Sequence, residues 1–528
     1  MRWSDIDIEL TPLHGLLSGW AAERPESKVL IFEGTDIFSG RYEEYTYREM
    51  NELANKFANA LIGLGVKKGD RVALYLPNCP EFVIAYLGIL KAGASMVPVS
   101  PIHTEREVTY VMNDAGCVAV VTATPLAANV NRDNLPALRE ILLIDVPEGV
   151  QSFYGSLQEA RASEPFIDID VRNDIAMIPY TSGTTGVPKG APHTHYEFTW
   201  NLREALGHIR FEDDGVIMTV TPMFHVTGYH DTFGIGLFAG IPTVLMERFD
   251  PQKILQLIQK HHVNYTLIPT PGLIYLLNVP EKEKYDLESL RCVLSGGAAV
   301  PQEIGQAFTS AFGVDLVEGY GSTEALITNL NPLSELGEIK FGSVGIRLNN
   351  SEEIIIKIVD PYNGDEEKEQ GEVGEIIIKS PSVCREYLNK PEDTKEFLRD
   401  GFWYSGDIGY LDDEGYLFIV DRKKAMINVS GFKCWPREVE EVIFTHDKVS
   451  DVVVVGKPDP LKGEVPVAFI SLKPGEKADA EEIREYLKDK LAKYKIPVEY
   501  IFLESIPKTA QGKTQKEELM RILQEREG

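Results

Sequence analysis

Short apolar runs alternate with segments of helical periodicity along most of the first 340 residues. The runs 71–77 and 118–123 read as strands, and 80–94 and 104–116 read as helices, the second opened by Thr104 and stopped by Gly116. The same alternation recurs between residues 241 and 313. Because strands that alternate with helices are typical of parallel architecture, the sequence predicts an α/β fold built on layered parallel sheets.

The pattern changes after about residue 340. Strand-like runs at 352–360, 374–380 and 415–421 are joined by turn-rich, acidic connections, which predicts a β-rich subdomain at about 340–423. The last segment carries its own strands and helices. Since 528 residues are too many for a single core, we expect a large N-terminal domain over 1–423 and a small, mobile α+β domain over 424–528.

The amino-acid composition limits the binding partners and the cellular compartment that can be expected for the protein. The net charge is −28 and no basic stripe compensates for it, which argues against a nucleic-acid partner. Five scattered cysteines without a C-x-x-C pair indicate reduced thiols and a cytoplasmic protein. The longest uncharged stretch near the middle, 232–246, is too short to span a bilayer, so no transmembrane segment is expected.

Residues 180–190 read "YTSGTTGVPKG" and follow an apolar, strand-like run. The stretch is not a Walker A loop, because Lys189 follows Pro188 and Gly190 occupies the position of the Mg²⁺-binding hydroxyl. Its chemistry still suits phosphate, since it combines glycines, hydroxyl donors and one cation. A flexible polar surface loop is the alternative. The residues that we expect at the phosphates are Thr181, Ser182, Gly183, Thr184, Thr185 and Lys189.

Six further motifs follow in a fixed order: "TPMFHVTG" (221–228), "EGYGSTEA" (318–325), "GEIIIKSP" (374–381), "YSGDIG" (404–409), "DRKKAMINVSGFKCWPREVE" (421–440) and "PKTAQGKTQKEEL" (507–519). With the 180–190 loop, they make the chain resemble the adenylate-forming superfamily of acyl-CoA synthetases, aryl-CoA ligases, firefly-type luciferases and peptide-synthetase adenylation domains. The resemblance covers nearly the whole chain. It implies ATP, Mg²⁺ and coenzyme A as cofactor and co-substrates.

The resemblance also implies roles for single residues. The 180–190 loop would grip the β- and γ-phosphates, with Thr184 among the catalytic residues. Glu324 would bind Mg²⁺, Thr323 the α-phosphate, and Asp407 both ribose hydroxyls. Arg422 would contact ribose and phosphate. The adenine site would be formed by Tyr320, whose ring faces the base, together with Gly296, Gly297, Ala298, Glu318, Gly319 and Gly321.

The C-terminal segment carries the rest of the expected chemistry. In the family, the lysine that matches Lys513 binds both the substrate carboxylate and the α-phosphate, where positive charge assists attack of one anion on another. Lys424 would be the hinge about which the small domain rotates. Gly431 would line the pantetheine tunnel, although Ser430 stands where CoA-using relatives often carry a lysine. Cys434 is expected to be a buried filler without a catalytic role.

The second motif limits the class of carboxylic acid that could be the substrate. Residues 221–230 contain no carboxylate that could hold an amino group, which disfavours an amino-acid substrate. His225 would lie between the acyl pocket and the adenylate. The glycine-rich, apolar run 228–240 favours the alkyl chain of a medium- to long-chain fatty acid.

Three alternatives stay open at this stage. They are an aryl-CoA ligase of the hydroxycinnamate or benzoate type, an adenylating enzyme that uses a carrier-protein thiol, and a non-catalytic sensor of nucleotide or acyl-CoA. A sensor would be expected to have lost Lys513, Glu324 or Asp407, and all three are present. Assembly as a homodimer and peripheral contact with a membrane also stay open.

Overall fold

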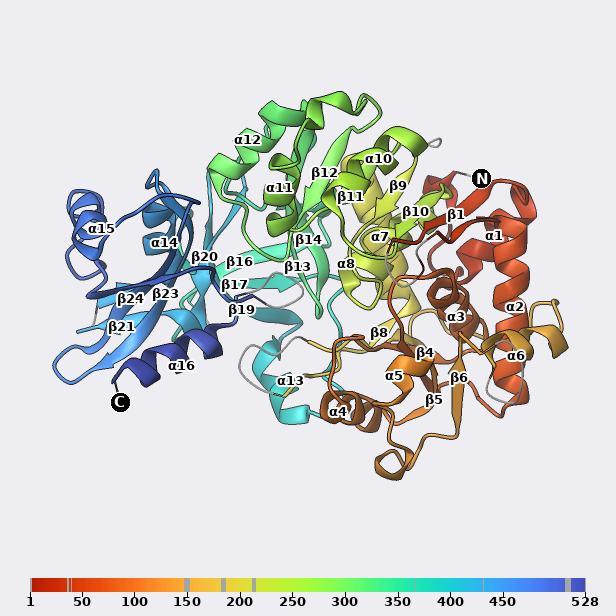
Figure 1. Ribbon diagram of the computed structural model, residues 1–528. Coiled ribbons are helices and arrows are strands. Elements are labelled where there is room, and N and C mark those ends of the chain that lie inside the picture. Colours follow the sequence, from red (N-terminus) through yellow and green to blue (C-terminus); the bar gives the residue numbers. More distant parts are fainter. Residues whose placement is uncertain are drawn as a thin grey trace.

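The computed structural model (Figure 1) describes residues 2–35, 38, 40–146, 152–181, 187–210, 215–364, 366–430, 432–508 and 514–527. Two large sheets and a smaller third sheet form the N-terminal part of the chain, and a fourth sheet lies in the C-terminal part. The predicted α/β fold with a large N-terminal domain and a smaller C-terminal domain is confirmed.

The largest sheet has nine strands and a parallel centre. From β1 through β10, β9, β11 and β12 to β13 the neighbours run parallel, whereas β2, β14 and β15 pair antiparallel at the two edges. In spatial order the strands are β15 (Ile346–Arg347), β14 (Leu326–Leu330), β13 (Asp315–Ser322), β12 (Cys292–Ser295), β11 (Tyr265–Leu267), β9 (Ile217–Thr219), β10 (Thr243–Met246), β1 (Lys28–Glu33) and β2 (Tyr42–Thr46).

The second sheet has six strands, of which only β8 pairs antiparallel. In spatial order they are β6 (Glu140–Leu143), β5 (Cys117–Thr122), β3 (Arg71–Tyr75), β4 (Ser95–Pro98), β7 (Ile175–Met177) and β8 (His193–Thr194).

Helices fill the space between these two sheets and cover their outer faces. The largest hydrophobic cluster joins side chains of both sheets to α2, α3, α7 and α9, so these helices form the middle layer. Every residue of α3 is buried there. The helices of this part of the chain are α1 (Gly15–Glu23), α2 (Tyr47–Gly63), α3 (Pro80–Lys91), α4 (Glu105–Ala115), α5 (Thr124–Ala127), α6 (Phe153–Glu159), α7 (His195–Ile209), α8 (Val226–Tyr229), α9 (Phe233–Ala239), α10 (Pro251–His261), α11 (Thr270–Leu277), α12 (Gln302–Phe312) and α13 (Pro391–Phe397).

Local sequence signals set several of these boundaries. Thr104 and Glu107 form a reciprocal capping box at the start of α4, which satisfies two of the amide groups that a helix start leaves open. Gly116 ends the helix in a left-handed conformation with φ of 62°, which costs glycine little. Both expectations for this helix are confirmed.

The third sheet matches the expected β-rich segment. It contains β16 (Ile355–Val359), β17 (Gly374–Lys379), β18 (Leu398–Arg399), β19 (Phe402–Leu411) and β20 (Leu417–Arg422). In Figure 1 it lies between the nine-stranded sheet and the C-terminal domain. Its last two strands carry Asp407 and Arg422, and β20 ends just before the predicted hinge at Lys424.

The C-terminal sheet has cores on both of its faces, one against α14 and α15 and one against α16. Its elements are β21 (Ile427–Val429), β22 (Phe432–Cys434), α14 (Pro436–Phe444), β23 (Val449–Asp459), β24 (Gly463–Leu472), α15 (Ala480–Leu487), β25 (Glu499–Leu503) and α16 (Lys516–Glu527). The domain boundary at 423/424 stays a prediction.

Two chain-wide features bear on the expectations from composition. All five cysteines are buried and none is in a disulfide. Within the described ranges, no helix combines the length and the apolar character that crossing a bilayer requires.

Candidate active site

The predicted residues of the adenine site lie at the carboxyl ends of two neighbouring parallel strands, β12 and β13. Gly296, Gly297 and Ala298 follow β12, and residues 318–322 are the last five of β13. A Cβ on Gly296 would lie 3.1 Å from the carbonyl oxygen of Gly319, so the two motifs are in close backbone contact. Carboxyl ends of parallel strands are the usual place for ligands in such sheets.

The first five residues of the motif "EGYGSTEA" belong to a strand. β13 continues to Ser322 because it pairs antiparallel with β14. A Cβ on Gly321 would come within 2.2 Å of the carbonyl oxygen of Leu326, so only glycine permits this pairing. Thr323 and Glu324 follow in the turn between the two strands.

Two buried carboxylates belong to this region. Glu318 accepts a hydrogen bond of 2.9 Å from the backbone N–H of Val300, and burial raises its pKa to about 7. Asp407 is 4% exposed, and burial raises its pKa as well. Desolvation of this kind is common at functional sites.

Both oxygens of Asp407 have partners. Tyr320 donates its hydroxyl to Oδ2 across 2.5 Å, and Arg422 Nε lies 2.7 Å from Oδ1. Asp407 and Arg422 are register partners on β19 and β20, which explains why the cation lies beside this carboxylate. The Tyr320 ring stacks on Trp403 at 6.1 Å between centroids. The structure therefore brings together the three residues that were expected to contact adenine and ribose.

The 180–190 loop, which is expected to hold phosphate, has a short hairpin at its base. Tyr180 and Gly190 form an antiparallel bridge, and Thr181 donates its N–H to the Lys189 carbonyl across 2.9 Å. The Lys189 ammonium forms an ion pair with Asp393 and lies 5.1 Å from the ring centroid of Tyr387. The expected phosphate ligands Ser182, Gly183, Thr184 and Thr185 lie outside the described residues.

Glu324 is half-buried and held by two hydrogen bonds from one segment. The hydroxyl of Tyr387 donates to its Oε1 across 2.6 Å, and the N–H of Cys384 donates to its carbonyl across 2.7 Å. In the parts of the chain that the structure describes, no group of three or more His, Cys, Asp or Glu side chains could hold a metal ion. A single carboxylate nevertheless fits Mg²⁺ that keeps phosphates and water as its other ligands.

His225 lies at the start of α8, where its Nδ1 is 2.9 Å from the hydroxyl of Thr227. The loop before it is fixed by Asn78, which follows β3 of the other large sheet. The Asn78 amide donates to the carbonyls of Thr221 and Met246 across 3.0 and 2.9 Å and accepts from the N–H of Met223 across 2.6 Å. The backbone that leads to His225 is thereby tied to both sheets.

The predicted hinge lies on an exposed turn between the domains. Lys424 is exposed within the 3₁₀ turn Lys423–Ala425. Just before it, the Asp421 carboxylate accepts a 2.8 Å hydrogen bond from the N–H of Arg437 in α14. Lys433 of β22 lies 4.4 Å above the ring of Tyr362, which follows β16. These two contacts join the C-terminal domain to the third sheet in the orientation described.

Two further predicted residues belong to the C-terminal domain. Gly431 and Lys513 lie outside the described residues. On either side of the 509–513 segment, Lys508 and Thr514 pair as an antiparallel bridge. Ser430, the neighbour of Gly431, has a left-handed backbone with φ of 53°, which is uncommon for a residue with a side chain. Cys434 is buried, and burial raises its pKa to about 12, which agrees with the role of a filler.

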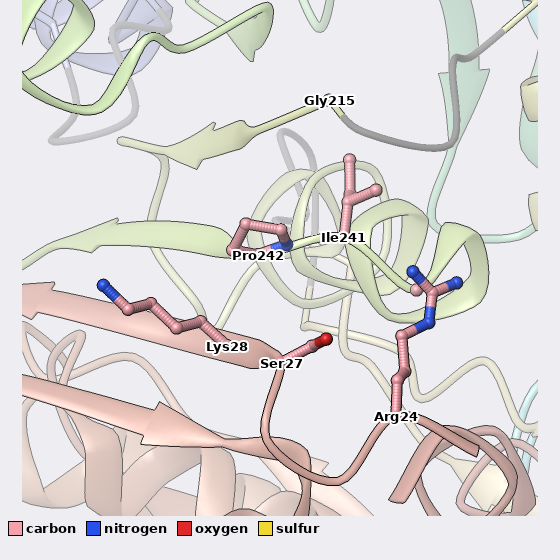
Figure 2. Close-up of a pocket in the computed structure, with 7 residues that line it drawn as sticks. Arg24, Ser27, Lys28, Gly215, Ile241 and Pro242 are labelled. Carbon is pink, nitrogen blue, oxygen red and sulfur yellow. The ribbon is translucent and has the colours of Figure 1, made fainter.

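A cavity of about 260 Å³ lies elsewhere on the nine-stranded sheet (Figure 2). Gly215 precedes β9, Pro242 precedes β10, and Lys28 begins β1, so this cavity is at the amino ends of the parallel strands. Its other lining residues are Arg24, Ser27, Gly240 and Ile241. It is therefore on the sheet edge opposite the candidate site and separate from it.

Sequence reasoning missed three residues that support the site. Tyr387 holds Glu324, Asn78 holds the loop before His225, and the ring of His193 donates from Nε2 to the Thr323 carbonyl across 2.8 Å. Each acts across more than 60 residues of sequence, and none belongs to the recognised stretch around its partner. The sequence signal that could have pointed to these three residues is a polar side chain directly beside an apolar strand or helix.

Comparison with known proteins agrees with this geometry. The family model described as AMP-binding enzyme matches residues 17–388, and the model described as AMP-binding enzyme C-terminal domain matches residues 438–513. A long-chain-fatty-acid–CoA ligase of Bacillus subtilis is 35% identical over 98% of this chain and 96% of its own length. A 4-coumarate–CoA ligase of Oryza sativa is 32% identical over the same shares.

Among solved structures, ATP-bound MatB from Rhodopseudomonas palustris superposes with a TM-score of 0.88 and 28% identity, over 97% of this chain and 99% of the other. The extent of these matches agrees with the seven motifs, which lie between residues 180 and 519. The chain therefore belongs to the AMP-binding enzyme family of adenylate-forming acid–thiol ligases.

Proposed function

We propose that the protein is an ATP-dependent fatty acid–CoA ligase for medium- to long-chain acids. The first step is RCOO⁻ + ATP → RCO-AMP + PPᵢ, in which a carboxylate oxygen bonds to the α-phosphorus and the bond to pyrophosphate breaks. In the second step the CoA thiol attacks the acyl carbon, AMP leaves with the bonding electron pair, and the thiol proton is released. No general base is required in the first step, because the acid enters as a carboxylate.

The observation that carries this proposal is the Tyr320–Asp407–Arg422 group beside Glu324. A buried carboxylate with a flat aromatic ring at one oxygen and a guanidinium at the other suits a nucleoside phosphate. Ribose hydroxyls would donate to Asp407, and adenine would lie against Tyr320 and the backbone of Gly296–Ala298. Mg²⁺, when bound at Glu324, would neutralise charge on the triphosphate.

The cations of the site are ion-paired in the structure described. Lys189 is paired with Asp393, and Arg422 with Asp407. Substrate phosphates would replace Asp393 as the ion-pair partner of the Lys189 ammonium. Arg422 can contact a phosphate and Asp407 at the same time, because a guanidinium carries five donors. Lys513 would bring a further positive charge to the acid and the α-phosphate during adenylation. The same domain would then rotate about Lys424 to admit the CoA thiol past Gly431.

The preference for a fatty acid rests on the relatives more than on the glycines of the second motif. A Cβ on Gly236 of α9 would approach Thr243 Oγ1 to 2.5 Å, and one on Gly228 would approach the Pro222 carbonyl to 2.2 Å. These two glycines therefore serve close packing, so the glycine content of 228–240 does not by itself support an alkyl pocket. The long-chain-fatty-acid–CoA ligase of Bacillus subtilis, at 35% identity, supports the fatty acid.

An aryl-CoA ligase is the second candidate. Several plant 4-coumarate–CoA ligases are 32–34% identical to this chain, which favours a hydroxycinnamate as the alternative acid. Transfer to a carrier-protein thiol is the alternative for the second step.

Pyrophosphate release with a panel of acids separates these candidates. The panel holds fatty acids of six to eighteen carbons, 4-coumarate, benzoate and an amino acid, each with and without CoA. We expect the highest kcat/KM with fatty acids and a CoA thioester as product. Preference for 4-coumarate would assign the aryl reaction, release of acyl-AMP that CoA does not consume would favour another thiol, and no release with any acid would overturn the proposal.

The setting of the protein also belongs to the proposal. Five buried, unpaired cysteines support a cytoplasmic location. Homodimer formation and contact with a membrane that supplies the acid are predictions, which light scattering and vesicle co-sedimentation can check.

A further inference from the structure

The chain between β17 and α13 lies beside both the 180–190 loop and the turn that carries Glu324. Ser382 donates its hydroxyl to the Ala325 carbonyl across 2.8 Å, and Cys384 donates its N–H to the Glu324 carbonyl across 2.7 Å. Farther along, Leu388 donates its N–H to the Gly190 carbonyl across 2.8 Å. Residues 382–388, here named the bridging segment, therefore join two motifs that are more than 130 residues apart in sequence.

Tyr387 is the one member of this segment whose side chain contacts functional groups from both motifs. Its hydroxyl lies 2.6 Å from Glu324 Oε1, and its ring centroid lies 5.1 Å from the Lys189 ammonium. The ring is fixed by Phe397, at 4.3 Å between centroids, and the Tyr387 N–H is fixed by the hydroxyl of Thr394 across 2.9 Å. The side chain is only 8% exposed, so few other orientations are open to it.

The chemistry of this contact has a defined direction. Glu324 Oε1 accepts and the phenol of Tyr387 donates across this 2.6 Å contact, because a carboxylate oxygen has no hydrogen to donate. A hydrogen bond to one carboxylate oxygen fixes the rotation of the group and leaves the second oxygen available to a ligand. The electron-rich face of the ring also attracts the Lys189 cation.

We propose that Tyr387 is a positioning residue for ATP activation: its hydroxyl aims the Glu324 carboxylate at the metal on the triphosphate, and its ring holds Lys189 near the phosphates. The inference rests on the proposed function, because it gives Glu324 and Lys189 the roles described there. Lys189 is paired with Asp393 in this structure, so binding of the triphosphate exchanges one anionic partner for another while the ring stays in place.

Tyr387→Phe tests the hydroxyl while keeping the ring, its packing and its contact with Lys189. Tyr416→Phe is the matched control. Tyr416 is 7% exposed, donates its hydroxyl to the Glu338 carbonyl across 2.7 Å, and has the Lys340 ammonium 4.3 Å from its ring centroid. Both variants thus lose one tyrosine hydrogen bond and keep one cation–ring contact, but Glu338 and Lys340 belong to no site residue set.

The readout is binding of α,β-methylene-ATP by calorimetry at a series of Mg²⁺ concentrations, with a melting curve for each protein. We expect Tyr387→Phe to need about tenfold more Mg²⁺ for half-maximal affinity, as loss of a hydrogen bond to a charged group implies, while affinity without Mg²⁺ is unchanged. Tyr416→Phe should follow the wild type. A double-mutant cycle with Glu324→Gln should remove the effect of Tyr387→Phe, because the hydroxyl acts through that carboxylate.

Two results overturn the inference. One is an unchanged Mg²⁺ titration of Tyr387→Phe, and the other is an equal loss of affinity with and without Mg²⁺. In both cases a wild type with Mg²⁺-dependent binding leaves the proposed function standing. A wild type whose binding of the analogue is independent of Mg²⁺ would overturn the inference together with the metal role of Glu324.

Discussion

The hydroxyl of Tyr320 lies 2.5 Å from Oδ2 of Asp407, and this hydrogen bond joins β13 of the nine-stranded sheet to β19 of the third sheet. The two residues come from motifs that are 87 positions apart. Because Asp407 is buried, the bond offsets part of the cost of keeping a carboxylate away from water. The proposed nucleotide site and the junction of the two sheets therefore depend on the same contact.

Tyr320→Phe should weaken both the binding of ATP and the junction of the two sheets. The variant keeps the ring that stacks on Trp403 but leaves the buried carboxylate with one partner fewer, which implies a loss of about 1.5–3 kcal/mol in the free energy of unfolding. We expect the KM for ATP to rise several-fold with little change in the KM for the acid. Denaturant unfolding and initial-rate kinetics check these values, and an unchanged KM for ATP would separate this contact from nucleotide binding.

Asn78→Asp should change the KM for the acid and leave the KM for ATP nearly unchanged. The carboxylate can still accept from the Met223 N–H, but it cannot donate to the carbonyls of Thr221 and Met246. The loop before His225 should shift, with a KM for the acid about tenfold higher, as the loss of two buried hydrogen bonds implies, and a KM for ATP within about twofold of the wild type.

The control for this variant is Asn113→Asp. Asn113 is exposed and donates a side-chain hydrogen bond to the Asn134 carbonyl across 2.6 Å, away from the site. It should leave both KM values unchanged. If Asn78→Asp changed both in proportion, the role of Asn78 would be general folding support.

Glu318→Gln should change the pH dependence of stability. The pKa of Glu318 rises from an ordinary 4.5 to about 7 on burial, so between these values the unfolded chain loses its proton first and wild-type stability falls as pH rises. Glutamine has no such titration and can still accept from the Val300 N–H. Between pH 5 and 8 the wild type should lose up to about 3 kcal/mol more unfolding free energy than the variant.

Urea unfolding of both proteins at several pH values measures this difference. The pKa of Glu440 is also about 7 and contributes with the same sign in both proteins, so its effect cancels in the comparison. Parallel curves for the two proteins would show that Glu318 ionises in the folded state as easily as in the unfolded chain.

Lys513→Ala should separate the two half-reactions. If Lys513 faces the acid and the α-phosphate in only one domain orientation, its loss should slow adenylation by orders of magnitude and largely spare thioester formation from preformed acyl-AMP. Lys508→Ala is the control, since Lys508 forms a 2.6 Å ion pair with Asp451 within the C-terminal domain. An equal loss in both steps would argue against two orientations in this protein.

Local signals in the sequence were sufficient for most of the framework. The N-cap Thr104 and the stop at Gly116 predicted α4, since such effects involve only neighbouring residues. The order of motifs likewise predicted that Tyr320, Glu324, Asp407 and Arg422 serve one nucleotide, and the structure brings Tyr320, Asp407 and Arg422 into direct contact.

What the sequence did not reveal depends on contacts between distant segments. The extension of β13 through residues 319–322 depends on pairing with β14. In the sequence, the glycine-rich run 228–240 favours an alkyl chain, but Gly236 of α9 allows this helix to approach the sheet closely. Tyr387 and Asn78 lack a local pattern, because their partners become neighbours only when the sheets assemble.

The burial of all five cysteines has a practical consequence for observing the enzyme at work. Burial raises the pKa of Cys117 and Cys434 to about 12 and that of Cys79 and Cys384 well above the usual range, so native thiols should react slowly with maleimide dyes. Dyes could then be attached selectively through Tyr362→Cys and Lys433→Cys, whose parent side chains meet across the domain junction. Energy transfer between the two labels would report whether the small domain rotates in single molecules during turnover.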